Sequence, residues 1–128
     1  MDIFNQIKDY APVQKQDCVE IEFPIAFFAS HGSLLRFSIA PKEGGYVVAC
    51  LDDMFYESNG SQERYFNIFM KHDKHYHYDM QIVNDVIYKE YPENHSVTMA
   101  LNDFIRFFIM FDDFIMDNDV IGHEEDFE

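Results

Sequence analysis

The last third of the chain carries a helical pattern long enough to constrain what the rest can fold into. Capping residues stand between Asn94 and Ser96, and apolar residues then recur at helical spacing to about Met116. Plotted at ~100° per residue, they form one broad apolar face, which we expect to be the core side. Its members are Val97, Ala100, Leu101, Phe104, Phe107, Phe108, Phe111, Phe114 and Ile115.

The residues before this helix predict strands and hairpins. One segment alternates apolar and charged residues, and two later pairs of strands are each joined by a short polar or glycine-ended loop. The predicted strands are residues 18–23, 34–40, 46–51, 80–82 and 86–91, and the predicted helices 2–10 and 62–72. We therefore expect an α+β fold. A small antiparallel sheet of about five strands, made of two hairpins plus an N-terminal strand, packs against the long C-terminal helix. A shorter middle helix and a short N-terminal helix complete it.

The 128 residues fit one domain, which we assign to residues 1–116, with an acidic and flexible tail at 117–128. The formal net charge is −15, and residues 92–128 hold ten acids and a single base, Arg106. Such a surface repels phosphate backbones and anionic lipids, so we expect no direct nucleic-acid or membrane binding. It attracts basic proteins instead. The alternative explanation is that the acidic charge only keeps the protein soluble.

The predicted partner-binding residues lie on the C-terminal helix and after it. The acids are Asp112, Asp113, Asp117, Asp119, Glu124, Glu125 and Asp126. Three large apolar residues, Ile105, Ile109 and Met116, fall on the helix face expected to meet solvent. A homodimer, a partner or the folded-back tail would cover them, or they are singly exposed.

Cys18 and Cys50 are far apart in sequence and form no C-x-x-C pair. The first residues show no basic stretch leading into an apolar run, and the apolar segment from Phe104 to Phe111 is too short to cross a bilayer. We therefore expect a cytoplasmic protein with reduced thiols.

Two clusters offer ligands for a metal ion. Asp52 and Asp53 follow a predicted strand directly, with Glu57 nearby, although a charged strand end that opens a loop is the simpler explanation. The second cluster comprises His72, Asp73, His75, His77 and Asp79. Imidazoles two apart on an extended segment can ligate zinc or nickel, although His72 also suits a helix C-terminus.

Common catalytic motifs are absent from the sequence. No lysine has an acid two residues before it, and G-x-S-x-G, the Walker lysine loop and G-x-G-x-x-G are missing. We therefore expect neither an enzyme nor a bound cofactor.

The order of the predicted elements resembles a bacterial and phage family described as domain of unknown function 1828. The matching pieces are residues 19–24, His31, residues 34–39, Gly44 to Val47, Asp52-Asp53, the hairpin 80–91 and the helix through Phe108. Met54 stands where the family pattern has glycine, and the 117–128 segment has no counterpart. The resemblance implies an α+β fold and a setting among prophages or other mobile elements, and it implies no activity.

Our main hypothesis from the sequence is an acidic interaction module that masks a basic surface of another protein, as nuclease inhibitors, immunity proteins and DNA mimics do. Two alternatives remain open. One is a metal-dependent enzyme or metal sensor, and the other is a structural homodimer built on the C-terminal helix.

Overall fold

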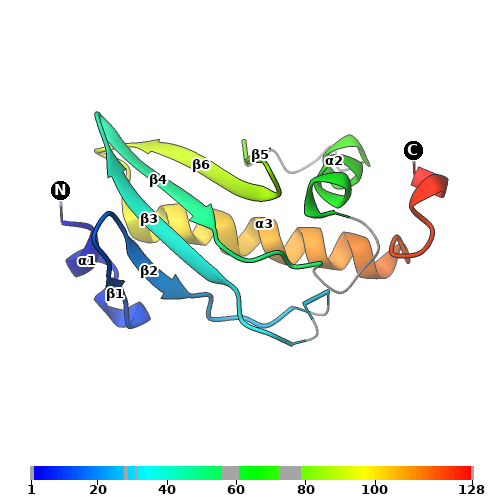
Figure 1. The fold of residues 1–128 in the computed structure, drawn as a ribbon, viewed down its shortest axis with the longest axis horizontal. Coiled ribbons are helices and arrows are strands. Elements are labelled where there is room, and N and C mark those ends of the chain that lie inside the picture. The colour runs from blue at the N-terminus through cyan, green and yellow to red at the C-terminus, as the bar shows by residue number, and fades with distance from the viewer. Residues whose placement is uncertain (1, 28, 31, 56–60, 73–78, 128) are drawn as a thin grey trace.

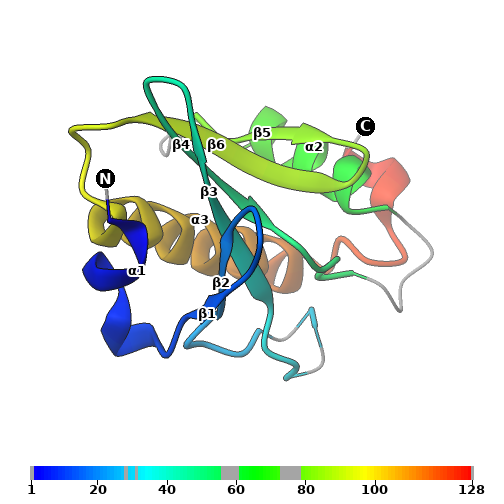
Figure 2. The same cartoon turned by 60° about the vertical axis from the view of Figure 1, so that its left-hand side comes forward.

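A computed structural model describes residues 2–27, 29–30, 32–55, 61–72 and 79–127 of the chain. Six strands form one antiparallel sheet in the order β1-β2-β3-β4-β6-β5, and the helix α3 lies along one face of it (Figures 1 and 2). The expected α+β fold is confirmed, with one strand more than expected. The strands are β1 (Val13–Gln14), β2 (Val19–Glu22), β3 (Arg36–Lys42), β4 (Gly45–Cys50), β5 (Gln81–Val83) and β6 (Val86–Pro92). The helices are α1 (Ile3–Gln6), α2 (Gln62–His72) and α3 (Val97–Asp117), with 3₁₀ turns at Lys8–Tyr10 and Glu124–Phe127.

Two tight turns set the register of the sheet. Lys42 pairs with Gly45, so the β3–β4 loop is the two residues Glu43-Gly44 rather than the five predicted from the sequence. Gly44 adopts φ +81°, which only glycine reaches at little cost. The β5–β6 turn places Asn84 and Asp85 both at positive φ, as the tightest hairpin turns require.

The hydrophobic core lies between the sheet and α3. Alternate residues of β3 and β4, such as Phe37, Ile39 and Val48, are fully buried on the face that meets the helix. Phe37 packs edge-on against Phe104 and Phe108 of α3, with ring centroids 5.6 and 5.5 Å apart. Eight of the nine residues predicted for the apolar face of α3 are buried, and Phe114 is half-buried. That face therefore holds the helix on the sheet.

The two smaller helices pack near opposite ends of α3 (Figure 1). Phe66 and Phe69 of α2 contact Phe107 of α3 at 5.8 and 5.6 Å between ring centroids. At the other end, the side-chain oxygen of Gln6 accepts a hydrogen bond from the backbone N–H of Val97 at 3.0 Å. The expected cap from Ser96 is not made, because its side chain forms no capping hydrogen bond.

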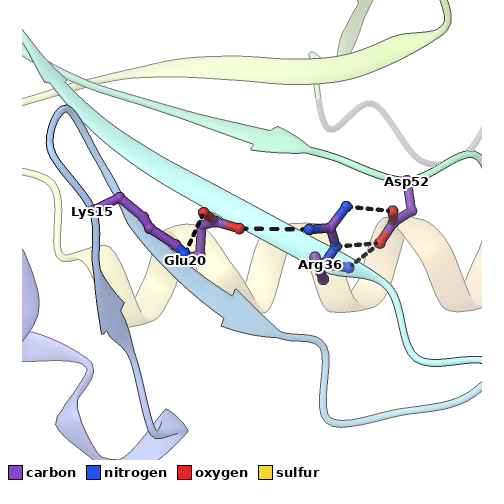
Figure 3. A network of polar contacts seen from close by, with 4 residues as sticks. All are labelled: Lys15, Glu20, Arg36 and Asp52. Atoms are coloured by element: carbon purple, nitrogen blue, oxygen red, sulfur yellow. Dashed lines mark hydrogen bonds and ion pairs between the residues drawn. The ribbon is translucent and has the colours of Figure 1, made fainter.

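No helix in the described part of the chain covers the other face of the sheet (Figure 2). A line of charges crosses the strands there (Figure 3). Glu20 of β2 lies 3.8 Å from both Lys15 and Arg36, and Arg36 bonds Asp52. The cations of this face are therefore already paired with acids of their own chain.

Within the described residues, no helix combines the length and the apolar content that crossing a bilayer requires.

Candidate functional site

Exposed carboxylates gather on the last turns of α3 and on the segment that follows it. Asp113 and Asp117 are one helical turn apart and both exposed. Asp119, Glu125 and Asp126 are also exposed, and Glu124 is half-buried. We call these six residues, Asp113, Asp117, Asp119, Glu124, Glu125 and Asp126, the C-terminal acidic surface.

The segment after α3 is packed onto the domain, which differs from the flexible tail expected from the sequence. Val120 is completely buried, and its N–H donates to the carbonyl of Ile115 at 3.0 Å. The hydroxyl of Tyr65 on α2 donates to Glu124 at 2.5 Å. The low apolar content of the segment suggested fraying, but one buried valine and contacts to α2 are enough to dock it.

His72 anchors the end of the same segment. Its Nε2 lies 2.8 Å from the carbonyl oxygen of Phe127, and its ring packs edge-on against the Phe127 ring at 5.8 Å. Phe114 of α3 contacts both rings, at 6.2 Å and 6.3 Å. The acids of residues 124–126 are thus carried on a turn that α2 and α3 hold in place.

Part of this surface has no ion pair within the described residues. Asp113, Asp117 and Glu125 form no ion pair with any described residue, whereas His123 lies 3.5 Å from Asp119 and 4.0 Å from Asp126. The hydrogen bond from Tyr65 is the main cause that lowers the pKa of Glu124, and the charge of Arg64 lowers it further. The carboxylate of Glu124 is therefore held in its charged form at neutral pH.

Asp112 does not belong to the acidic surface, although the sequence placed it there. Its side chain is only 3% exposed, and it accepts a hydrogen bond from the backbone N–H of Ala29 at 2.9 Å. The helical pattern put position 112 near the edge of the apolar face, where a carboxylate is expected to reach solvent. The irregular loop before β3 covers that edge instead.

The three apolar residues predicted on the solvent side of α3 are half-buried. Ile105, Ile109 and Met116 pack against the core cluster from its margin. They are not among the large hydrophobic residues that the structure exposes. A homodimer built on them stays a prediction.

Asp52 and Asp53 point to different partners. Arg36 donates three hydrogen bonds to the carboxylate of Asp52. They come from its Nε at 3.2 Å, from its Nη2 at 3.0 Å and from its backbone N–H at 2.9 Å (Figure 3). These hydrogen bonds lower the pKa of Asp52. Asp53 accepts the N–H of Phe55 at 2.7 Å, and burial raises its pKa. In the structure Asp52 thus closes the β3–β4 hairpin, and Asp53 stabilises the turn that follows.

The histidine cluster lies mostly outside the described residues, because Asp73, His75 and His77 fall in 73–78, as Glu57 falls in 56–60. His72 is described and bonds Phe127, and Asp79 is exposed at φ +56°. Among the residues that the structure describes, no three histidine, cysteine or acidic side chains are grouped to hold a metal ion. The metal site stays a prediction.

Sequence reasoning missed the roles of Tyr65 and His72. Tyr65 lies on the buried side of α2, and its bond to Glu124 joins residues 59 positions apart. A contact so distant in sequence leaves no local pattern, so only the fold reveals it.

No family model, curated protein or solved structure matches the chain. The resemblance to domain of unknown function 1828 therefore stays a prediction.

Proposed function

We propose that this protein is an interaction module that binds and masks a basic surface of another protein through its C-terminal acidic surface. The observation that carries the proposal is the placement of these acids on a docked segment. Carboxylates on a loose tail pay a larger ordering cost on binding than carboxylates already held by α2 and α3.

The distribution of the cations supports the same proposal. The ion pairs of Lys15, Arg36 and Lys42 in the described structure are all made on the sheet, with Glu20, Asp52 and Glu90. On the acidic surface, His123 lies within 4.0 Å of Asp119 and Asp126, whereas Asp113, Asp117 and Glu125 form no ion pair with a described residue. An uncompensated anionic field of this kind accelerates encounter with basic proteins and repels nucleic acid and anionic lipid.

The partner class that this chemistry favours is a protein whose own ligand is a polyanion, such as a nuclease or another nucleic-acid-binding protein. Carboxylates then occupy positions that phosphates would take. The proposal includes no catalytic step, cofactor or metal, and it places the protein in the cytoplasm. We also propose a setting among mobile genetic elements, as the family resemblance implies.

Binding by charge-matched variants tests the proposal. The variant Asp113→Asn/Asp117→Asn/Glu125→Gln removes three unpaired acids from the surface. The control Asp17→Asn/Glu43→Gln/Glu93→Gln removes the same charge from exposed positions elsewhere. Each variant serves as bait in a low-salt pulldown from the source organism, and association rates are then measured with the captured protein.

We expect wild type and the control to capture a basic protein, and the surface variant to associate about tenfold or more slowly. A DNA duplex should bind to none of them. Equal loss in both variants would mean that total charge, and not this surface, governs capture. No basic partner at all would remove the proposal.

A further inference from the structure

The β2 side of the sheet bears a hollow of about 340 Å³, within the usual range for small-molecule sites. It lies beside the line of charges that Figure 3 shows, and three of those charged residues line it. Its lining includes Tyr10, Val13, Lys15, Glu20, Glu22 and Arg36.

The hollow exists because β1 is short. The two residues of β1 pair with the first two residues of β2, and the ladder then stops. Ala11 donates its N–H to the carbonyl of Lys8 at 3.3 Å instead of extending the ladder, and its φ of +52° turns the chain away from β2. The end of β2, which carries Glu22, therefore borders a space whose other wall includes Tyr10.

Three carboxylates and two cations stand at or beside the hollow, so one carboxylate is left over. Glu20 lies 3.8 Å from both Lys15 and Arg36, and Arg36 also binds Asp52 at 3.0 Å. Glu22 is exposed and is the cross-strand neighbour of Arg36, but it forms no ion pair with a described residue. The cations are thus compensated within the chain, and Glu22 gives the hollow a net negative charge.

Accessible apolar surface lies next to this charge. Val13 lines the hollow and is 54% exposed, so most of its contact with water is open to replacement by a ligand. Tyr10 is half-buried: part of its side chain packs against the hydrophobic core, and the side chain also lines the hollow.

We propose that this hollow is a binding site for a small organic cation with an apolar body, such as a primary amine on a short hydrocarbon. The ammonium group donates a charge-assisted hydrogen bond to Glu22, and the hydrocarbon rests on Val13 and Tyr10. Lys15 and Arg36 repel a second positive charge, so a monocation binds better than a polyamine. The site is distinct from the C-terminal acidic surface, none of whose residues line it.

Three probes separate the two halves of this recognition. They are phenethylammonium, which has both the charge and the ring; phenethyl alcohol, which lacks the charge; and methylammonium, which lacks the ring. Each is titrated at pH 7 into the isotope-labelled full chain while the backbone amide signals of residues 13–22 are followed by NMR. We expect saturable shifts with phenethylammonium and at least about fivefold weaker binding of the other two.

A pair of charge-matched variants tests the assignment to Glu22. Glu22→Gln should weaken phenethylammonium binding about fivefold or more, because the ammonium loses its charged acceptor. Glu125→Gln removes the same charge from the C-terminal acidic surface and should change the affinity less than about twofold.

Equal losses in the two variants would mean that any acid of this chain attracts the amine, and would overturn the proposal. Equal binding of the amine and the alcohol, or no saturable binding of phenethylammonium, would overturn it as well. The three-probe comparison needs only wild type, so it decides even where a variant fails to fold.

Discussion

The carboxylate of Asp112 on α3 accepts a hydrogen bond from the backbone N–H of Ala29 across 83 residues of sequence. Ala29 is 5% exposed, so its backbone N–H is shielded from water. If this hydrogen bond were lost, the buried N–H would lose the Asp112 carboxylate as its acceptor. The bond pins the irregular loop between β2 and β3 to the helix. It also gives this buried acid a hydrogen-bond partner in the middle of a phenylalanine-rich helix.

Replacing Asp112 by alanine should therefore destabilise the fold by about 2–3 kcal/mol, because a buried N–H donor loses its acceptor. Asparagine retains an acceptor oxygen and should cost less. The neighbouring Asp113→Ala is the control: this side chain is exposed, and the change should stay within about 0.5 kcal/mol. Urea unfolding of the three variants gives the comparison, and equal effects at positions 112 and 113 would refute the assigned role.

Two adjacent glycines should respond very differently to alanine. A Cβ on Gly45 would stand 2.0 Å from the carbonyl oxygen of Tyr91, inside the pairing of β4 with β6, so Gly45→Ala should cost about 3 kcal/mol. At Gly44 a Cβ would meet nothing within 4 Å. The backbone φ of +81° is then the one unfavourable feature, and Gly44→Ala should destabilise the fold by about 1 kcal/mol. Thermal unfolding of both variants tests this, and Gly44→Ala should unfold at the higher temperature.

The ion pair between Arg36 and Asp52, which we call the clamp, should make the free energy of unfolding depend on pH in the acid range. The pKa of Asp52 is lowered by its hydrogen bonds to Arg36, so the clamp stabilises the fold above the unfolded-state pKa of 3.8 and loses this effect as pH falls through the lower folded value. Asp52→Asn should thus be less stable than wild type at pH 7, by a small amount because the pair is partly exposed, and the gap should close below about pH 4.

The double variant Arg36→Gln/Asp52→Asn isolates this coupling. If the clamp causes the stability difference, the double variant should lose less free energy of unfolding than the sum of the losses in the two single variants. Purely additive losses, or a gap that does not narrow as the pH falls below about 4, would contradict it.

Removing the hydroxyl of Tyr65 should loosen the C-terminal segment without unfolding the domain. Tyr65→Phe deletes the hydrogen bond to Glu124 and keeps the ring contact with Phe55 at 4.5 Å. Amide exchange at residues 120–126 should accelerate about three- to tenfold, while amides of β3 and β4 keep their protection. Tyr88→Phe, on the uncovered sheet face, provides the matched control. Unchanged exchange in Tyr65→Phe would mean that Val120 alone docks the segment.

The two cysteines should differ in reactivity. Burial raises the pKa of the Cys50 thiol to about 12, and its Sγ donates to the carbonyl of Asp52 at 3.1 Å. Cys18 is only half-buried, although burial raises its pKa as well. Titration with a disulfide reagent at pH 8 should modify Cys18 slowly in the native protein and Cys50 only in denaturant. A Cys18→Ser variant that still reacts natively would contradict this.

The elements with a strong local pattern could be read from the sequence. The bounds predicted for α2 agree with the structure, and the apolar face of α3 was identified because nine apolar residues repeat at helical spacing. The turn residues predicted both hairpins, but the predicted β3–β4 loop has five residues and the observed loop has two. A proline at position 41 suggested a loop, whereas Pro41 in fact pairs with Tyr46 inside the ladder.

Contacts between distant segments could not be read in the same way. The burial of Asp112 depends on a loop 83 residues earlier, and the anchoring of Glu124 depends on Tyr65. An isolated carboxylate looks the same in a sequence whether it is solvated or buried. The placement of the acidic surface was therefore predicted in outline, while one of its members and the docking of its segment were not.

The bond from Val97 to Gln6 gives the long helix a cap that comes from the opposite end of the polypeptide. The hydroxyl of Thr98 reinforces it by donating to the backbone carbonyl of Gln6 at 3.2 Å. The capping of this first turn thus depends on a contact between residues 91 positions apart, and contacts so distant in sequence form slowly compared with local turns. Purification tags or trimming at the start of the chain should consequently disturb the beginning of its final helix, so fusions are better placed elsewhere.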